Sequence, residues 1–187
     1  MKMPMRLHVL ASLAVFVVSL PCFAANEPDH NLKVVIIRHG EKPKKGEGLS
    51  CTGENRAREL PEVLYRKFNR PDYIYVPALG SGNPPVHGRM FQTALPFANK
   101  HNLSINKEYA GHDYKNISES VLKKTGTVLM VWNHSYVSSL AKSLGIDSPP
   151  RWHDNDFDSI WIITYTEGKA GLSFDKEGLS PSSACNN

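Results

Sequence analysis

Three short apolar runs divide the chain into candidate β-strands. They span residues 32–37 (LKVVII), 73–76 (YIYV) and 127–132 (TVLMVW), and polar or turn-forming residues follow each of them. Continuous runs of this length, rich in β-branched and aromatic residues, are typical of strands that are buried on both faces of a parallel sheet. The pattern therefore predicts a sheet with at least three buried strands.

Segments with helical spacing of apolar residues lie between these runs. Thr52 is a suitable N-cap for a first helix, and Pro61 is expected to bend or restart it. Residues 89–100 and 117–122 predict two more helices, and Ser135 is expected to cap a fourth. Strands that alternate with helices in this way are typical of a layered α/β fold.

The end of the chain predicts a hairpin. Residues 160–164 and 172–174 are strand-like and flank the turn-forming residues Glu167, Gly168 and Lys169. We therefore expect an α/β protein of three layers, in which helices flank a mainly parallel central sheet.

The N-terminal segment has the form of a secretory signal peptide. Lys2 and Arg6 precede an apolar run over residues 7–20, and a proline and small residues follow it. We expect a signal peptide at 1–24 and a single catalytic domain at 25–187, located in the periplasm or secreted. Because the apolar run is shorter than a membrane span of about 20 residues, we expect no stable membrane insertion after signal removal; an uncleaved anchor is the alternative.

Composition narrows the choice of partners and compartment. The net charge is +4, and it falls to +2 without Lys2 and Arg6. No basic run with interleaved aromatic residues is present, so nucleic acid is not an expected partner. Outside the signal peptide only Cys51 and Cys185 remain. In an oxidising compartment these two cysteines can pair, but two free thiols are the alternative, since sequence alone does not give their separation.

Cationic side chains occur where the predicted fold places its ligands. Arg38 and His39 directly follow the first strand, His134 follows the third, and Arg89 begins a helix. Ligands of open α/β sheets bind beyond the carboxyl ends of the strands, so these residues can converge. Two guanidinium groups with imidazole suit a phosphate dianion, because guanidinium presents a planar fork to two oxygen atoms.

The same residues carry a resemblance to a known family. The Arg-His-Gly-Glu sequence at 38–41 resembles the signature of the histidine phosphatase superfamily, which is also called phosphoglycerate mutase-like. The sequence at 89–94 (RMFQTA) is similar to the second-arginine helix of that superfamily, and His134 matches its second histidine. The resemblance extends over residues 33–144 in the order of the family, and it implies a phosphoglycerate mutase-like fold.

The resemblance also implies a reaction. His39 would attack phosphorus to give a phosphohistidine, which water then hydrolyses. Arg38, Arg89 and His134, with Gly40 beside them, would bind the substrate and stabilise charge in the transition state. We expect the arginines to lower the pKa of His39, and a nearby backbone carbonyl to hold one of its ring nitrogens. The scheme needs a small phosphorylated substrate but no cofactor and no metal.

The general acid of the superfamily is a carboxylate whose position varies between its branches. Ser135 follows His134 where one branch of the superfamily has aspartate, so that branch is not indicated. Glu108 is the first candidate for the acid, Asp113 the second and Glu41 the third. If none of them serves, the enzyme would favour substrates with good leaving groups or phosphohistidine itself.

Two other classes of protein remain open from the sequence. A metal-dependent hydrolase could use the histidines with the aspartates at 153–158, although this stretch also fits a solvated, cap-like segment and no zinc-binding spacing supports the metal. A non-catalytic phospholigand-binding protein would keep the cations without needing His39. A phosphoglycerate mutase proper is a weaker variant, because an exported protein has little access to glycolytic intermediates. The physiological substrate and the oligomeric state are left open by the sequence.

Overall fold

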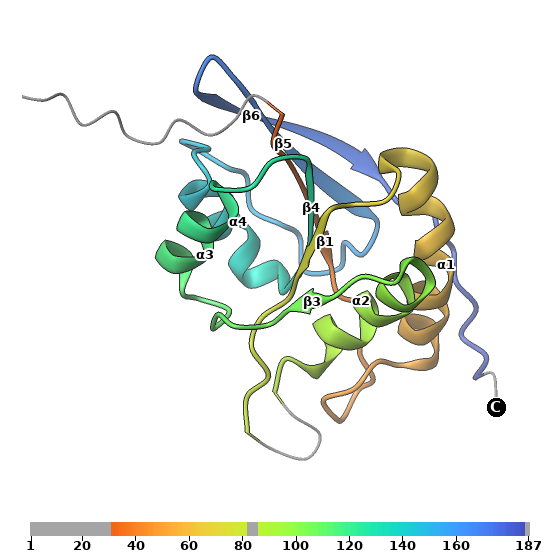
Figure 1. Ribbon diagram of the computed structural model, residues 1–187. Coiled ribbons are helices and arrows are strands. Elements are labelled where there is room, and N and C mark those ends of the chain that lie inside the picture. The colour runs from red at the N-terminus through yellow and green to blue at the C-terminus, as the bar shows by residue number, and fades with distance from the viewer. Residues whose placement is uncertain (1–30, 82–85, 186–187) are drawn as a thin grey trace, which may run out of the picture.

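A six-stranded sheet forms the centre of the protein (Figure 1). The computed structural model describes residues 31–81 and 86–185, so the predicted signal peptide at 1–24 lies outside the described residues. Helices cover both faces of the sheet, which gives the three-layer α/β arrangement expected from the sequence. Within the described residues, no helix is long and apolar enough to cross a membrane.

The sheet has the strand order β3-β2-β4-β1-β5-β6, in which four strands are joined by parallel pairings, whereas β5 pairs antiparallel with both β1 and β6. The parallel strands are β1 (Lys33–Arg38), β2 (Tyr73–Tyr75), β3 (Ile105–Asn106) and β4 (Thr127–Trp132). The two other strands are β5 (Ser159–Thr166) and β6 (Lys169–Lys176). The hairpin prediction is confirmed, because Glu167 and Gly168 both have positive φ angles in the turn between β5 and β6.

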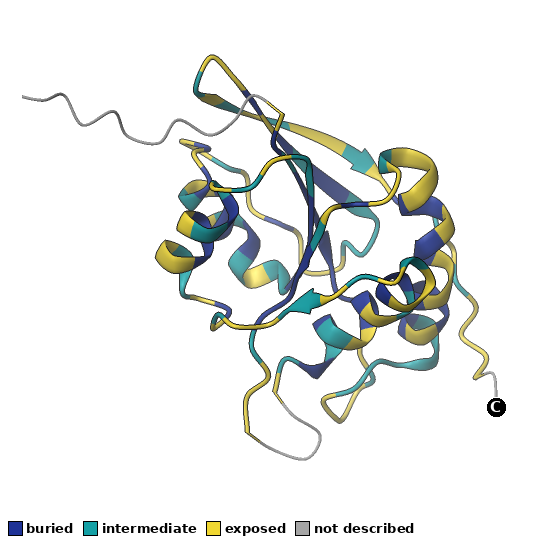
Figure 2. Cartoon of the chain, in the orientation of Figure 1, coloured by how far each residue is buried: buried dark blue, intermediate teal, exposed yellow. Residues whose placement is uncertain are grey.

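Helices α1 (Cys51–Phe68) and α2 (Gly88–His101) cover one face of the sheet. Helices α3 (Tyr114–Val121) and α4 (His134–Ser143) cover the other. Since successive side chains of a strand point to opposite faces, the apolar runs supply both layers of the core at once. Figure 2 shows the resulting burial along the central strands.

The ends of two helices differ from the sequence prediction. Helix α1 is capped by Ser50, whose side chain accepts a hydrogen bond from the backbone N–H of Gly53, and not by Thr52. Helix α4 is capped by Asn133, whose Oδ1 atom accepts from the N–H of Ser135. In both cases an earlier residue with a suitable side chain adopts the extended backbone that a cap needs, so the helix begins sooner.

Pro61 lies inside α1 and does not interrupt it. Proline removes one backbone donor from a helix and usually kinks it. Leu60 and Leu64 are almost fully buried against the sheet on either side of this position. We infer that this packing holds the helix together across the lost hydrogen bond, so the predicted restart at Pro61 is wrong, whereas the predicted bend stays a prediction.

Candidate active site

His39 lies at the end of the central strand β1. Its backbone N–H donates to the carbonyl of Trp132 on β4, which extends the parallel ladder by one residue. His39 is only 3% exposed, and the Nδ1 atom of its ring lies 2.7 Å from the carbonyl oxygen of Gly40. Because a carbonyl can only accept a hydrogen bond, Nδ1 carries the proton and Nε2 keeps its lone pair. The expectation that a backbone carbonyl holds one ring nitrogen is confirmed.

The surroundings keep the His39 ring uncharged. The pKa of His39 is lowered to about 4, mainly by burial and in smaller part by the charges of Arg38, Arg89 and His134, whereas the hydrogen bond to Gly40 opposes the shift. The predicted effect of the arginines on this pKa is confirmed in direction. A neutral imidazole near pH 7 is the form that can act as a nucleophile.

The loop between α4 and β5 holds Arg38 in place. One guanidinium nitrogen of Arg38 donates to the backbone carbonyls of Asp154, at 2.6 Å, and Asp156, at 3.1 Å. The guanidinium carbon lies 3.8 Å from the centre of the Phe157 ring. Burial lowers the pKa of Arg38 to about 10, so the group remains a cation near neutrality.

His134 forms the first residue of α4, next to the carboxyl end of β4. Its Nε2 atom lies 3.6 Å from Oδ1 of Asp154 and 3.3 Å from Oγ of Ser135. Burial and the charge of Arg38 lower the pKa of His134, whereas the carboxylate of Asp154 opposes the shift. The two histidines predicted from the sequence thus act on each other electrostatically across the strand ends.

Arg89 lies in the first turn of α2 and faces the loop that follows β1. Its guanidinium lies 3.3 Å from a carboxylate oxygen of Glu47 and donates to the carbonyl of Gly46 at 3.3 Å. Its positive charge lowers the pKa of His39, so it belongs to the same cationic group as Arg38 and His134.

Two buried nitrogen atoms of this cationic group have no hydrogen-bond partner among the described residues. They are Nε of Arg38 and Nδ1 of His134. Native proteins rarely leave buried polar atoms unsatisfied, so each such atom calls for an explanation. These two unpaired nitrogen atoms are available for hydrogen bonds to an anion bound next to the neutral imidazole of His39.

Gly40 connects the loop that follows β1, residues 39–50, to two helices. Its backbone N–H donates to Oγ1 of Thr93 on α2 at 2.9 Å, and Thr93 in turn donates to the carbonyl of Arg89. A Cβ atom on Gly40 would lie 2.8 Å from the carbonyl oxygen of Gly53 in α1. The absence of a side chain at Gly40 therefore allows the backbone after His39 to pack directly on α1.

The three carboxylates considered for the general acid have other partners. Glu41 forms a bidentate ion pair with Arg56 of α1. Glu108 is exposed and accepts a hydrogen bond from Asn106, and Asp113 accepts from Asn116. Among the described residues, no hydrogen bond or ion pair joins any of the three to His39 or His134. The assignment of Glu108 as the acid stays a prediction.

The aspartates at 154, 156 and 158 do not gather around a metal position. The carboxylate of Asp156 accepts hydrogen bonds from the backbone N–H groups of Asp158 and Ser159 and from the Ser159 hydroxyl. The cap-like interpretation of this stretch is confirmed for Asp156. Over the described ranges, no group of three or more His, Cys, Asp and Glu side chains is arranged to hold a metal ion.

A cleft of about 400 Å³ opens beside His134. Besides His134, its walls come from α4 and from the loop between α4 and β5: Ser135, Ser138, Pro149, Arg151, Trp152 and Asp154. The sequence connected this loop with the site only through the aspartates of the metal-dependent alternative and not as a support for Arg38, because the loop holds Arg38 through backbone carbonyls, which every residue type possesses. Phe157 is, like Trp152, an aromatic residue in an otherwise polar stretch, and it is the residue that could have indicated this role.

The comparison with solved structures identifies the fold. Neither the comparison with family models nor that with curated protein sequences finds a match. Among solved structures, the protein histidine phosphatase SixA complexed with tungstate matches with a TM-score of 0.59 and 18% identity, over 78% of this chain and 97% of that one.

Two further structures match over similar shares of the chain. The phosphoserine phosphatase from Entamoeba histolytica, in complex with phosphoserine, has a TM-score of 0.53 and 15% identity over 79% of this chain and 98% of that one. The mycobacterial glucosyl-3-phosphoglycerate phosphatase with inorganic phosphate has a TM-score of 0.54 and 14% identity over 76% and 95%. All of these proteins belong to the histidine phosphatase superfamily, and the chain described here has the phosphoglycerate mutase-like fold of that superfamily.

Proposed function

We propose that the protein is a phosphatase that hydrolyses small phosphorylated substrates through a phosphohistidine on His39. One arrangement carries the proposal: a neutral imidazole, oriented by the Gly40 carbonyl, lies near the guanidinium groups of Arg38 and Arg89 and the imidazole of His134, and Arg38 and His134 each have an unpaired buried nitrogen. The structural neighbours, which include complexes with phosphoserine, tungstate and inorganic phosphate, support a phosphorylated ligand.

The reaction proceeds in two displacements. In the first, Nε2 of His39 forms a bond to phosphorus while the bond from phosphorus to the leaving oxygen breaks. In the second, a water oxygen attacks phosphorus, the N–P bond breaks, and inorganic phosphate leaves. Dividing the hydrolysis in this way replaces one difficult step by two easier ones.

Two guanidinium groups and the imidazole of His134 stabilise the transferring group. Arg38, Arg89 and His134 would contact the non-bridging oxygens, where negative charge is spread in the transition state. Since the Asp154 and Asp156 carbonyls and the Phe157 ring fix Arg38 beforehand, little rearrangement is needed at the moment of reaction. These steps use only side chains of this chain, so we propose that the activity does not depend on a metal ion.

The leaving group would lie in the cleft beside His134. Its walls combine the buried indole of Trp152 with the exposed charges of Arg151 and Asp154. Arg151 lowers the pKa of Asp154, so this carboxylate is ionised near neutrality and is not suited to donate a proton. We therefore propose that substrates with good leaving groups react fastest.

The first test of the function is a phosphatase assay with a generic aryl phosphate in the presence of EDTA. Wild type should turn over, and His39→Ala should lose the activity by a factor on the order of 10³ or more. His101→Gln is the matched control, because this histidine lies at the opposite end of α2 from Arg89 and stacks on Tyr65. Full turnover by His39→Ala would reject the proposal.

A second test identifies the intermediate. Rapid quenching with labelled substrate should trap a phosphoenzyme that is labile in acid and stable in base, as expected for a phosphohistidine. A different result would be that wild type shows no turnover and no labelled protein, while His39→Ala still binds inorganic phosphate. The protein would then be a non-catalytic phospholigand-binding protein and not an enzyme.

Export to the periplasm or the medium is part of the proposal. The predicted signal at 1–24 supports it, and so does the disulfide between Cys51 and Cys185, since disulfides persist in oxidising compartments. N-terminal sequencing of the protein from an expressing cell should begin after Ala24. An intact N-terminus in the cytosolic fraction alone would contradict export.

A further inference from the structure

The segment after β6, residues 178–185, lies along α1 without forming a helix or a strand (Figure 1). Most of it is exposed, and only Leu179 packs partly against the core. Chain ends with so little buried surface fray unless something ties them down. The contacts at the far end of the segment therefore decide whether it stays on α1.

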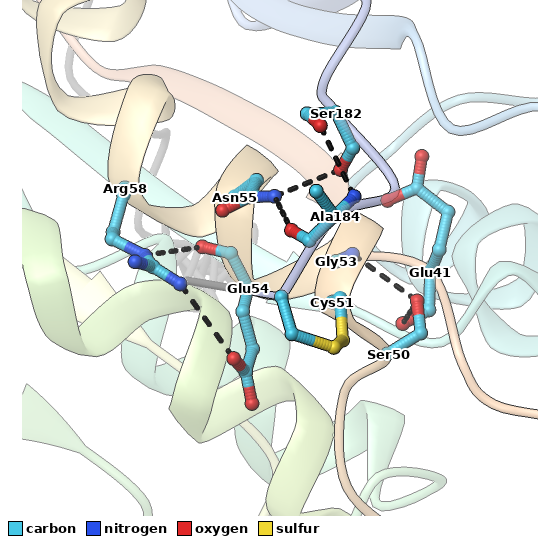
Figure 3. Close-up of a disulfide and its surroundings, with 10 residues drawn as sticks. Glu41, Ser50, Cys51, Gly53, Glu54, Asn55, Arg58, Ser182 and Ala184 are labelled. Carbon is cyan, nitrogen blue, oxygen red and sulfur yellow. Dashed lines mark hydrogen bonds and ion pairs between the residues drawn. A yellow bond between two sulfur atoms is a disulfide. The ribbon is translucent and has the colours of Figure 1, made fainter. Parts of the chain in front are cut away.

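Figure 3 shows how this C-terminal segment is attached. A disulfide joins Cys185 to Cys51, the first residue of α1, with a Cα–Cα distance of 4.8 Å. The buried side chain of Asn55 donates to the carbonyls of Ser182, at 2.8 Å, and Ala184, at 2.9 Å. The cysteine pairing, one of two alternatives left by the sequence, is confirmed, and all of these bonds end on the beginning of α1.

The same turn of α1 contacts the loop that follows β1, which begins with His39. The backbone N–H and the hydroxyl of Ser50 both donate to the carbonyl of Glu41, at 2.9 and 3.2 Å. Figure 3 shows Ser50 between Glu41 and Gly53. Gly53 packs backbone to backbone against Gly40 and Glu41, with no side chain between them that could absorb a displacement.

Gly40 passes the contact on to His39. Its carbonyl accepts the hydrogen bond from Nδ1 of His39, and its N–H is held by Thr93. A shift of the first turn of α1 would therefore move the acceptor that orients the ring. The sequence of contacts runs from the C-terminal segment through α1 and Gly40 to the imidazole without a gap.

We propose that the C-terminal segment 178–185, closed onto α1 by the Cys51–Cys185 disulfide, is a positioning element for the His39 ring. The inference rests on the proposed function, because the position of the ring matters for turnover only if His39 is the nucleophile. The segment acts through α1 and the Gly40 peptide and does not touch the substrate. Since Cys185 is exposed, a reductant in solution can reach the bond, so the orientation of His39 depends on the redox state.

The test compares wild type with the double variant Cys51→Ser/Cys185→Ser at a temperature where both are folded. With an aryl phosphate, kcat should fall about 10-fold or more in the double variant, because small misplacements of a reacting group have large effects on rate. KM should change less. Dithiothreitol should lower kcat of wild type to the same level and leave the double variant unchanged.

A second readout does not depend on activity. The midpoint of the His39 titration, followed by NMR, should move to higher pH in the double variant. Burial and the charges of Arg38, Arg89 and His134 lower the pKa of His39, and in a loosened loop the ring is less buried, so its pKa rises. The matched control is Lys67→Ala. Lys67 joins the last turn of α1 to Asp175 of β6 through an ion pair of 2.9 Å, so the control removes a link from the same helix at its other end.

The outcomes separate the two proposals. A double variant with unchanged kcat and an unchanged His39 titration would overturn the inference, even if the protein unfolds at a lower temperature. A lower kcat with the same titration shift in Lys67→Ala would overturn it as well, because the effect would then belong to α1 as a whole. Failure of the proposed function shows separately, as undiminished turnover in His39→Ala.

Discussion

The guanidinium group of Arg38 lies over the aromatic ring of Phe157, with 3.8 Å between the guanidinium carbon and the ring centre. The same ring meets the His39 imidazole edge-on, with 6.3 Å between centroids. One side chain from the loop before β5 thus touches both residues that end β1. Cation–π contacts of this kind contribute about 0.5 to 2 kcal/mol, depending on how far the pair is desolvated.

Replacing Phe157 should therefore impair catalysis without removing a reacting group. We expect Phe157→Leu to lower kcat about 5- to 30-fold, the factor that corresponds to about 1 to 2 kcal/mol. Steady-state kinetics with an aryl phosphate measure it. Phe174→Leu is the control, since Phe174 is 59% exposed on β6 and contacts Trp161 instead. Equal losses in the two variants would show that the effect is on stability and not on Arg38.

The acid limb of the rate profile reports the charge state of His39. Burial and neighbouring cations lower its pKa to about 4, so the ring is neutral and reactive above that pH and becomes protonated as pH falls through it. In Arg89→Gln one of these cations is gone, and the pKa of His39 should rise. The acid limb of kcat/KM should then move to higher pH, in addition to a loss of rate on the order of 10².

The control for this profile is Arg58→Gln. Arg58 is exposed on α1 and pairs with Glu54. Its replacement changes the net charge by the same amount as Arg89→Gln and leaves the site intact. The substrate ionises identically in every assay. A difference between the acid limbs of the two variants therefore reports a change in the pKa of a group on the enzyme. Superimposable acid limbs would disprove the electrostatic coupling between Arg89 and His39.

The placement of His39, Arg38 and His134 could be predicted because each follows an apolar strand, and parallel strands bring their carboxyl ends to one edge. The strand β3 could not, since two residues show no periodicity. Likewise the hydrogen bond from Arg56 to Glu177 joins residues 121 positions apart, and nothing in either local sequence distinguishes these residues from surface charges. Periodicity reveals elements, whereas contacts between loops depend on how the elements pack.

Thr93 provides a test of how firmly Gly40 is held. Its Oγ1 accepts the hydrogen bond from the Gly40 N–H, which is buried. Thr93→Val keeps the shape but leaves that N–H without an acceptor, so we expect a loss of stability of about 1 to 3 kcal/mol. We also expect kcat to fall. Thr93→Ser keeps the hydroxyl, so it should retain most of the stability, measured by urea unfolding, and most of kcat, measured by the phosphatase assay. A serine variant as impaired as the valine variant would assign the effect to packing of the methyl group.

One guanidinium group, that of Arg56, lies between two carboxylates. It pairs with Glu41 at 2.8 Å and with Glu177 at 2.5 Å, and the Glu177 side chain is inaccessible to solvent. Arg56 shares its single charge between the buried Glu177 and the partly exposed Glu41. Burial therefore raises the pKa of Glu177 to about 8, with smaller contributions from Asp158 and Glu41, although Arg56 opposes the shift.

This raised pKa makes stability depend on pH. The unfolded chain releases the Glu177 proton near its ordinary pKa of 4.5, whereas the folded protein keeps it until about 8. Since the folded state binds more protons between these values, its stability should fall as pH rises through this window, by at most about 1.4 kcal/mol per pH unit. In Glu177→Gln, which mimics the protonated side chain, this contribution should vanish, while the exposed control Glu54→Gln should follow wild type. Urea unfolding below, within and above the window measures the difference, and parallel curves for wild type and Glu177→Gln would show that the Glu177 carboxyl is ionised in the folded protein.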